Sequence, residues 1–154
     1  MVETQLVLIT RSDGGVSVMT FVVHSPRDGF RTEPTKDNIE ATIEKGRLDA
    51  VSWRFITPAD LPGRAYRNAW VDEGDAIGHD MEKAREIHRD KLRAERAPLL
   101  LALDVEYQRA DETGDAAEKA RVVAAKKRLR DLPSDPRIEQ ATTVAELASI
   151  TERG

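Results

Sequence analysis

Two runs of apolar and β-branched residues lie near the start of the chain, at 6–9 (LVLI) and 16–23 (VSVMTFVV). The link between them, RSDGG, holds residue types that tolerate a positive φ angle: Asp13, Gly14 and Gly15. This pattern predicts an antiparallel β-hairpin. A phosphate-binding loop would need a helix to start directly after the glycines, and none follows, so we interpret the glycines as a turn.

The next segment predicts one short helix. Residues 24–36 have loop character, with two prolines and a glycine. Asp37 precedes Glu40 by three positions, which is the spacing of a capping box. We therefore predict a helix over about 38–46, ended by Gly46.

Two further β-type segments follow. Apolar side chains alternate along 50–56, at Val51, Trp53 and Phe55, which predicts a strand. A second, shorter hairpin is predicted for 65–71 and 76–79, with Gly74 in its turn.

From Asp80 the period of the apolar residues changes to that of a helix, which the pattern predicts to run to about Thr113. Its apolar stripe has steps of three and four residues and comprises Met81, Ala84, Ile87, His88, Leu92, Leu99, Leu103 and Ala110. Pro98 interrupts this stripe. Either the helix kinks there, or one helix ends and another begins with proline in its first turn.

A tight turn between two helices is predicted at Gly114. A glycine stop, an aspartate cap at Asp115 and a glutamate three residues later at Glu118 mark such a turn. The second helix is predicted over about 116–131, with an inner stripe of Ala117, Ala120, Val123, Ala124 and Leu129.

The last element predicted is a short helix over about 144–152. LPSDP at 132–136 ends the preceding helix, and Thr143 with Glu146 forms a capping box. The predicted fold class is therefore α+β: a small antiparallel β-sheet with a short helix at the N-terminus, followed by a long C-terminal α-helical hairpin. We divide the chain into a mixed α/β subdomain at 1–79 and a helical hairpin with a short terminal helix at 80–154.

Composition narrows the functional classes. The chain has 154 residues, 34% of them charged and only 5% aromatic, with a net charge of −4 and no cysteine. Disulfide frameworks and thiolate metal sites are thereby excluded. The start, MVETQLVLIT, lacks the basic stretch of a signal peptide, and no apolar run has the ~20 residues needed to span a bilayer. We expect no membrane association.

Candidate catalytic chemistry is sparse. His79 and His88 are nine residues apart, so their rings would point in different directions from a helix, and the spacing matches no helical zinc pair. The sequence has no GxSxG, P-loop or GxGxxG motif. We predict no catalytic residues, no metal and no cofactor, and hence no enzyme.

Two basic stretches raise the question of nucleic-acid binding. Residues 126–130 read KKRLR, and 83–96 hold six Lys and Arg side chains against three acids. Antiparallel folding about Gly114 would merge them into one patch near the base of the hairpin. No aromatic residue interleaves this patch and many acids surround it, so we favour a solvated or protein-binding surface over a nucleic-acid interface.

Several segments carry a resemblance to a known class of proteins. They are ITRSDGGVSVMT at the start, Arg67-Asn68-Ala69-Trp70, the Ala/Arg-rich stretch from Met81 to Arg96, LLLALD at 99–104, KRLRDLP at 127–133 and the closing TTVAEL. With these segments the chain resembles small proteins of phage and prophage tail modules of α-proteobacteria, which act in tail fibre assembly or as tail assembly chaperone-like proteins. Many of those proteins end in a Trp-Pro-like tail, whereas this chain ends Thr151-Glu152-Arg153-Gly154.

The resemblance implies a structural or assembly role and no catalytic residues. We expect contacts with other phage tail proteins and a homo-oligomer built on the apolar stripes, because exposed helical stripes need partners. Two hypotheses remain. The chain is a structural component of the tail or tail fibre within the virion, or an assembly factor that acts in the host cytoplasm and is absent from the finished particle.

Overall fold

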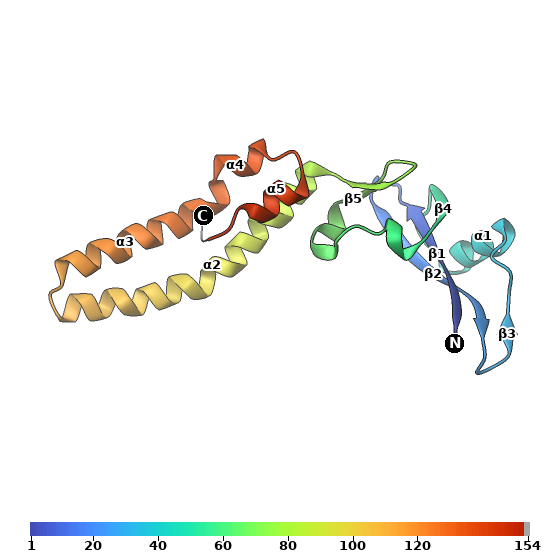
Figure 1. Ribbon diagram of the computed structural model, residues 1–154, viewed down its shortest axis with the longest axis horizontal. Coiled ribbons are helices and arrows are strands. Elements are labelled where there is room, and N and C mark those ends of the chain that lie inside the picture. The colour runs from blue at the N-terminus through green and yellow to red at the C-terminus, as the bar shows by residue number, and fades with distance from the viewer. Residues whose placement is uncertain (153–154) are drawn as a thin grey trace. The chain divides into compact units, whose positions relative to one another are not determined.

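The computed structural model describes residues 1–152 (Figure 1). Arg153 and Gly154, the last residues of the ending noted above, lie outside the described residues. The fold class is α+β, as predicted: an antiparallel sheet is combined with helices. The chain divides into two compact units, residues 1–80 and residues 81–154. We call them the sheet unit and the helical unit.

The sheet unit is built around a sheet with the strand order β3-β2-β1-β4. The strands are β1 (Glu3–Thr10), β2 (Val16–Ser25), β3 (Phe30–Arg31) and β4 (Ser52–Ile56). β1 pairs antiparallel with both β2 and β4, with Leu8 opposite Val18 on one side and opposite Arg54 on the other. Gly14, at φ +78°, allows the turn between β1 and β2.

Both faces of the sheet are covered. Helix α1 (Lys36–Lys45) lies over one face, where Ile39 packs with Val7, Ile9, Phe21 and Val23 (Figure 1). On the opposite face Leu8, Val16 and Ile56 pack with two residues from beyond β4, Trp70 and Ile77. Because β1 lies in the middle of the sheet, its successive residues are buried on alternate sides. This explains why LVLI is a continuous apolar run rather than an alternating one.

The second cover is made by short elements. They are the 3₁₀ helices η1 (Pro58–Asp60) and η2 (Arg64–Ala69) and the hairpin of β5 (Trp70–Asp72) and β6 (Ile77–His79). Arg54 donates to Asp72 at 3.0 Å and ties β4 to β5. Burial raises the pKa of Asp72, but the hydrogen bonds from Arg54 and Gly74 outweigh burial and hold that pKa below its ordinary value.

Two local predictions in this unit are wrong in detail. The hydroxyl of Thr35, not Asp37, caps α1, accepting from Asn38 N–H at 3.3 Å, so the helix begins earlier than predicted. Gly46 ends it in a right-handed conformation, and the positive φ (+49°) falls on Arg47. The first arm predicted for the second hairpin, 65–71, is strand only from Trp70, because η2 occupies the residues before it.

The helical unit consists of α2 (Met81–Glu112), α3 (Ala116–Asp131), η3 (Leu132–Ser134), α4 (Pro136–Gln140) and α5 (Val144–Ser149). Pro98 lies inside α2, which continues through it as one helix of 32 residues. At 1.5 Å per residue such a helix is about 48 Å long. The capping box of Thr143 and Glu146 begins α5, which ends at Ser149 rather than at 152.

Candidate protein-interaction surface of the helical unit

The turn between α2 and α3 sets their antiparallel course. Gly114 has φ +70°, and its N–H donates to the carbonyl of Asp111 at 3.1 Å, while Asp115 N–H donates to the carbonyl of Ala110 at 2.8 Å. These two bonds form a Schellman motif, which needs a left-handed residue at the glycine position. The Asp115 side chain accepts from Glu118 N–H at 2.9 Å and begins α3, whereas the Glu118 carboxylate binds Arg121.

The inner face of α2 holds part of the predicted stripe. Ala84, His88, Leu92 and Ala110 are buried in it. Met81, Ile87 and Leu103 are half-buried, and Leu99 is 39% exposed. The inner side of α2 from Ala84 to Leu92 is thus buried under the elements packed on it, whereas the stretch around 99–105 is less buried.

Of the stripe predicted for α3, only Leu129 lies on the inner face. The buried residues are Val122 and Leu129, with Ala125 half-buried between them, while Ala120 is exposed and Val123 is 53% exposed. Val122 and Val123 are separated by about 100° around a helix axis. Alanines occur on several sides of α3, so spacing alone selected the wrong side. Ala120 and Val123 belong to the outward face of the helix.

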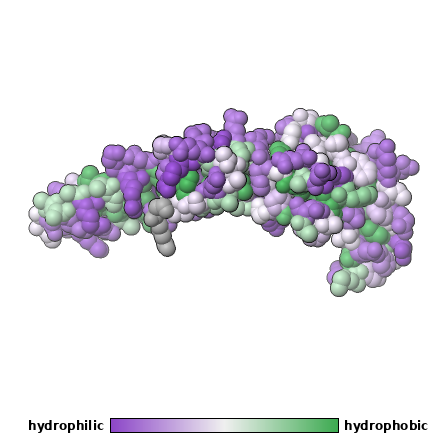
Figure 2. All heavy atoms as spheres, turned by 45° about the horizontal axis from the view of Figure 1, so that its top comes forward, coloured by the Kyte–Doolittle hydropathy of each residue, from purple (hydrophilic) through white to green (hydrophobic). Residues whose placement is uncertain are grey.

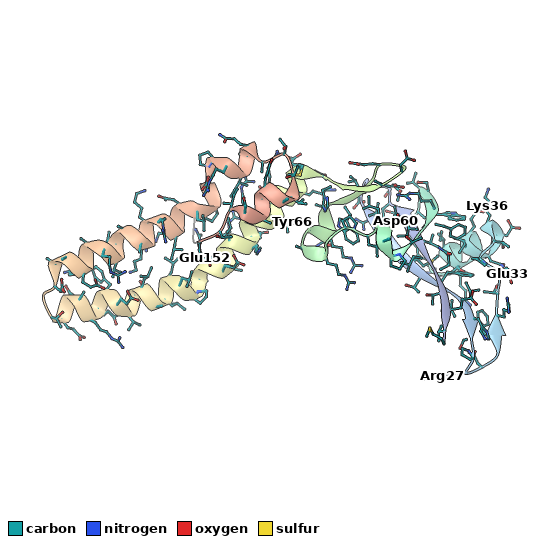
Figure 3. All side chains as sticks on the ribbon, in the orientation of Figure 1. Arg27, Glu33, Lys36, Asp60, Tyr66 and Glu152 are labelled. Carbon is teal, nitrogen blue, oxygen red and sulfur yellow. The ribbon has the colours of Figure 1, made fainter. Side chains whose placement is uncertain are left out.

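A groove of about 460 Å³ runs between α2 and α3. Its apolar lining consists of Leu99, Ala102, Leu103, Ala125 and Leu129, and its polar lining of Glu106, Arg128 and Glu152. Figure 3 shows Glu152 between the ribbons of the two helices. Leu99 and Leu103, both from the predicted stripe, therefore line an open groove and are not sealed in a core.

A second apolar surface lies on the outer side of α2. Leu101 is 67% exposed and Val105 is 46% exposed. Leu101 follows the buried Leu92 by nine residues, which places it about 180° around the helix from the inner face. On the face drawn in Figure 2, apolar residues lie among hydrophilic ones along this unit. A pair of helices can bury only one side of each, so these outward residues have no cover within the pair.

The two basic stretches lie side by side, as predicted, because Arg96 donates to the carbonyls of Leu129 (3.4 Å) and Arg130 (2.7 Å). Several of their cations nevertheless bind acidic partners. Lys126 pairs with Asp104 across the two helices, and Lys127 pairs with Asp131. On α2, Arg89 pairs with Glu86 and Glu139, Arg93 with Asp90 and Lys91 with Glu95. Each of these cations already has an acidic partner, which weakens the case for phosphate binding.

Two polar side chains of α2 bind the segment that runs from α4 to Ile150. The sequence pattern did not reveal this role. Arg85 donates to the carbonyls of Ile138 (3.2 Å) and Ala141 (2.9 Å). His88 is 1% exposed, and its Nε2 lies 3.0 Å from the carbonyl of Ile150. A carbonyl oxygen only accepts, so Nε2 carries the proton. Burial lowers the pKa of His88.

Helix α4 was not predicted, although the sequence contains its signal. Asp135 accepts from Arg137 N–H at 2.9 Å, and Pro136 occupies the first position of the helix. An aspartate cap followed by proline is a common helix start. Interpreting LPSDP only as the end of the preceding helix therefore misses α4.

In residues 1–152 no group of three or more His, Asp or Glu side chains is placed to hold a metal ion. No helix within the same range combines the length and apolar content that crossing a membrane requires.

Comparison with known proteins leaves the chain without an assigned family: no family model, curated protein or solved structure matches it.

Proposed function

We propose that the chain is a bacteriophage tail-associated structural protein, a component of the tail or tail fibre that works through protein–protein contacts. In this proposal α2 and α3 form a helical hairpin that packs against copies of itself and against other tail proteins. The tail setting derives from the sequence resemblance of the 81–104 and 127–133 segments. The mode of action derives from the helical unit.

We infer this mode of action from the exposure of large apolar side chains in the part of the α2–α3 pair nearer to its turn. Leu99, Leu101, Val105 and Val123 are between 39% and 67% exposed. They come from two helices and point to more than one side of the pair. Apolar side chains exposed in this way are available for contact with other proteins.

The contacts that join α2 to α3 do not involve the outward apolar residues. Ion pairs span the two helices at Lys119–Asp111, Arg121–Glu106 and Lys126–Asp104. The Nζ atoms of Lys119 and Lys126 also lie 5.5 and 5.2 Å from the centre of the Tyr107 ring. Partners can therefore approach the outward residues without the pair having to open.

Quantitative mass spectrometry of gradient-purified particles, produced from a prophage that encodes this chain, tests the tail role. A fixed, reproducible copy number per particle is the expected result. Presence in the infected-cell lysate together with absence from the particles would instead support the alternative, an assembly factor that leaves before the virion is complete. Absence of any copurifying tail protein from both fractions would overturn both forms of the proposal.

A further inference from the structure

A pocket of about 450 Å³ opens on the sheet unit. Leu6, Val18 and Thr20 line it from the sheet, and Leu61, Arg64, Arg67 and Trp70 line it from the segment that follows β4. Leu6 and Thr20 are register partners on β1 and β2, so the floor is one continuous strip of sheet surface. It is the part of that face which η2 and β5 leave uncovered.

The wall of the pocket is formed by η2 and the residues beside it. Leu61, Arg64, Arg67 and Trp70 are spaced three residues apart, and all four line the pocket. Arg64 and Arg67 belong to η2, whose backbone leaves helical angles at Tyr66 (φ −115°, ψ 31°), while Leu61 lies before η2 and Trp70 directly after it. The sequence L-x-x-R-x-x-R-x-x-W places two arginines on the rim, between an apolar residue and a buried tryptophan.

The charges of this rim are uncompensated. Among residues 1–152, neither Arg64 nor Arg67 makes an ion pair, whereas Arg11 and Arg54 of the same unit pair with Asp13 and Asp72. Trp70 is 4% exposed, and within the described range its indole Nε1 has no hydrogen-bond partner. Buried donors without a partner are uncommon in proteins, so this indole N–H is a donor available to a group bound at the pocket.

We propose that this pocket binds an acidic peptide segment of a partner protein, with an apolar side chain on the strip of Leu6 and Val18 and carboxylates at Arg64 and Arg67. Guanidinium groups match carboxylates in charge and in geometry. The apolar surface continues beyond the pocket to Val22, which is 38% exposed and shares this face of β2 with Val18 and Thr20. An elongated, open strip suits an extended chain, because small ligands occupy sites that bury most of their surface.

Fluorescence anisotropy on the full chain tests the proposal with a fluorescein-labelled peptide of alternating Leu and Glu. The matched probe replaces every Glu with Gln. We expect the acidic peptide to bind, the Gln peptide to bind about tenfold more weakly, and the difference to shrink in high salt. The double variant Arg64→Ala/Arg67→Ala should lose the preference for the acidic peptide.

Arg27→Ala is the matched control, because Arg27 lies at the tip of the β2–β3 turn, outside the pocket (Figure 3). It should leave the preference intact. Equal losses in the control and in the double variant would show nonspecific charge attraction and overturn the proposal. Complete displacement of the labelled peptide by octanoate, together with equal affinities for the Glu and the Gln peptide, would identify a site for small acids. That result would overturn the peptide assignment.

A readout independent of affinity comes from the two tryptophans of the chain. Trp70 lines the pocket, whereas Trp53 packs with the core under α1, on the other face of the sheet. In a ¹H–¹⁵N correlation spectrum, the acidic peptide should shift the indole signal of Trp70 and leave that of Trp53 in place. Movement of neither signal at saturating peptide would contradict the proposal, even if some binding were measured.

Discussion

The sheet unit and the helical unit build their cores in different ways. The sheet unit places β1 in the middle of its sheet and covers both faces, so Val7, Leu8 and Ile9 are at most 1% exposed. The helical unit buries one side of each long helix and leaves Leu101 and Val123 more than half exposed. Both units keep some large apolar side chains at the surface, since Val51 and Phe55 of the sheet unit are 70% and 44% exposed.

This difference shows that apolar content does not by itself indicate a core. Leu101 and Leu103 are two residues apart on α2, yet Leu103 lines the groove beside α3 and Leu101 points away from it. In a single amphipathic helix the outward position would be polar. We therefore expect an apolar residue at such an outward position to affect contacts with other proteins more than folding.

The sharpest test of this contrast substitutes aspartate at one inner and one outer leucine of the same helix. Leu92→Asp buries a charge at a position 1% exposed, and we expect it to destabilise the helical unit by several kcal/mol or unfold it. Leu101→Asp should leave the melting temperature within a few degrees of wild type. Circular dichroism at 222 nm during heating measures both. Equal melting temperatures for the two variants would show that the assignment of inner and outer faces is wrong.

The turn at Gly114 should be the next most sensitive position. A Val there must adopt φ near +70°, which costs roughly 1–2 kcal/mol for a residue with a Cβ. Gly63→Ala is the control, because Gly63 has φ −56° and open space around its Cβ position. Urea unfolding should show a lower midpoint for Gly114→Val alone. A midpoint unchanged by Gly114→Val would contradict the left-handed geometry of this turn.

The cap at Asp115 is expected to have a smaller effect. Asp115→Ala removes the acceptor of the Glu118 N–H bond and should cost about 1 kcal/mol. Asp115→Asn keeps a side-chain acceptor and should recover most of the loss. The urea midpoints of the two variants decide this. If they are equal, the cap makes no net contribution.

The pH dependence of the helical unit should be modest and should centre on His88. Its folded pKa lies below the ordinary value of 6.5, so the unfolded chain binds a proton more readily. The associated stability is fully present above pH 6.5 and is lost as the pH falls from there toward the folded pKa. Acidic groups whose pKa values are lowered, such as Asp72 and Glu146, change the free energy of unfolding only at lower pH. His88→Gln keeps a donor for the Ile150 carbonyl and should flatten the dependence between pH 7 and 5 in thermal melts. A slope equal to that of wild type would rule out His88 as its source.

The sequence was informative where one residue type has one local meaning. Gly14 and Gly74 stand in turns with positive φ, and Thr143 with Glu146 begins α5 through a capping box. The change of period at residue 80 lies next to the boundary between the two units. These signals depend on a few neighbouring residues and on backbone geometry, so they can be interpreted without knowledge of the tertiary structure.

The sequence was less informative where several positions satisfy the same pattern. On α3, the series through Ala120 and Val123 and the series through Val122 and Leu129 both have helical spacing, and the contact with α2 selects between them. Whether Pro98 splits a helix depends on whether neighbouring elements hold the chain on either side of it. The pocket of the sheet unit joins residues from β1, β2 and the segment after β4, and only their tertiary contacts bring them together.

Sedimentation equilibrium of the full chain over a range of concentrations tests the central claim most directly, that the outward apolar surface of α2 and α3 is a self-association surface. We predict a mass above the 17.2 kDa of one chain for wild type and for the control Gln140→Glu, at an exposed position on α4. Leu101→Glu/Val105→Glu should return the mass to 17.2 kDa with an unchanged helical signal. A wild-type chain that remains at 17.2 kDa at every concentration would contradict self-association through this surface.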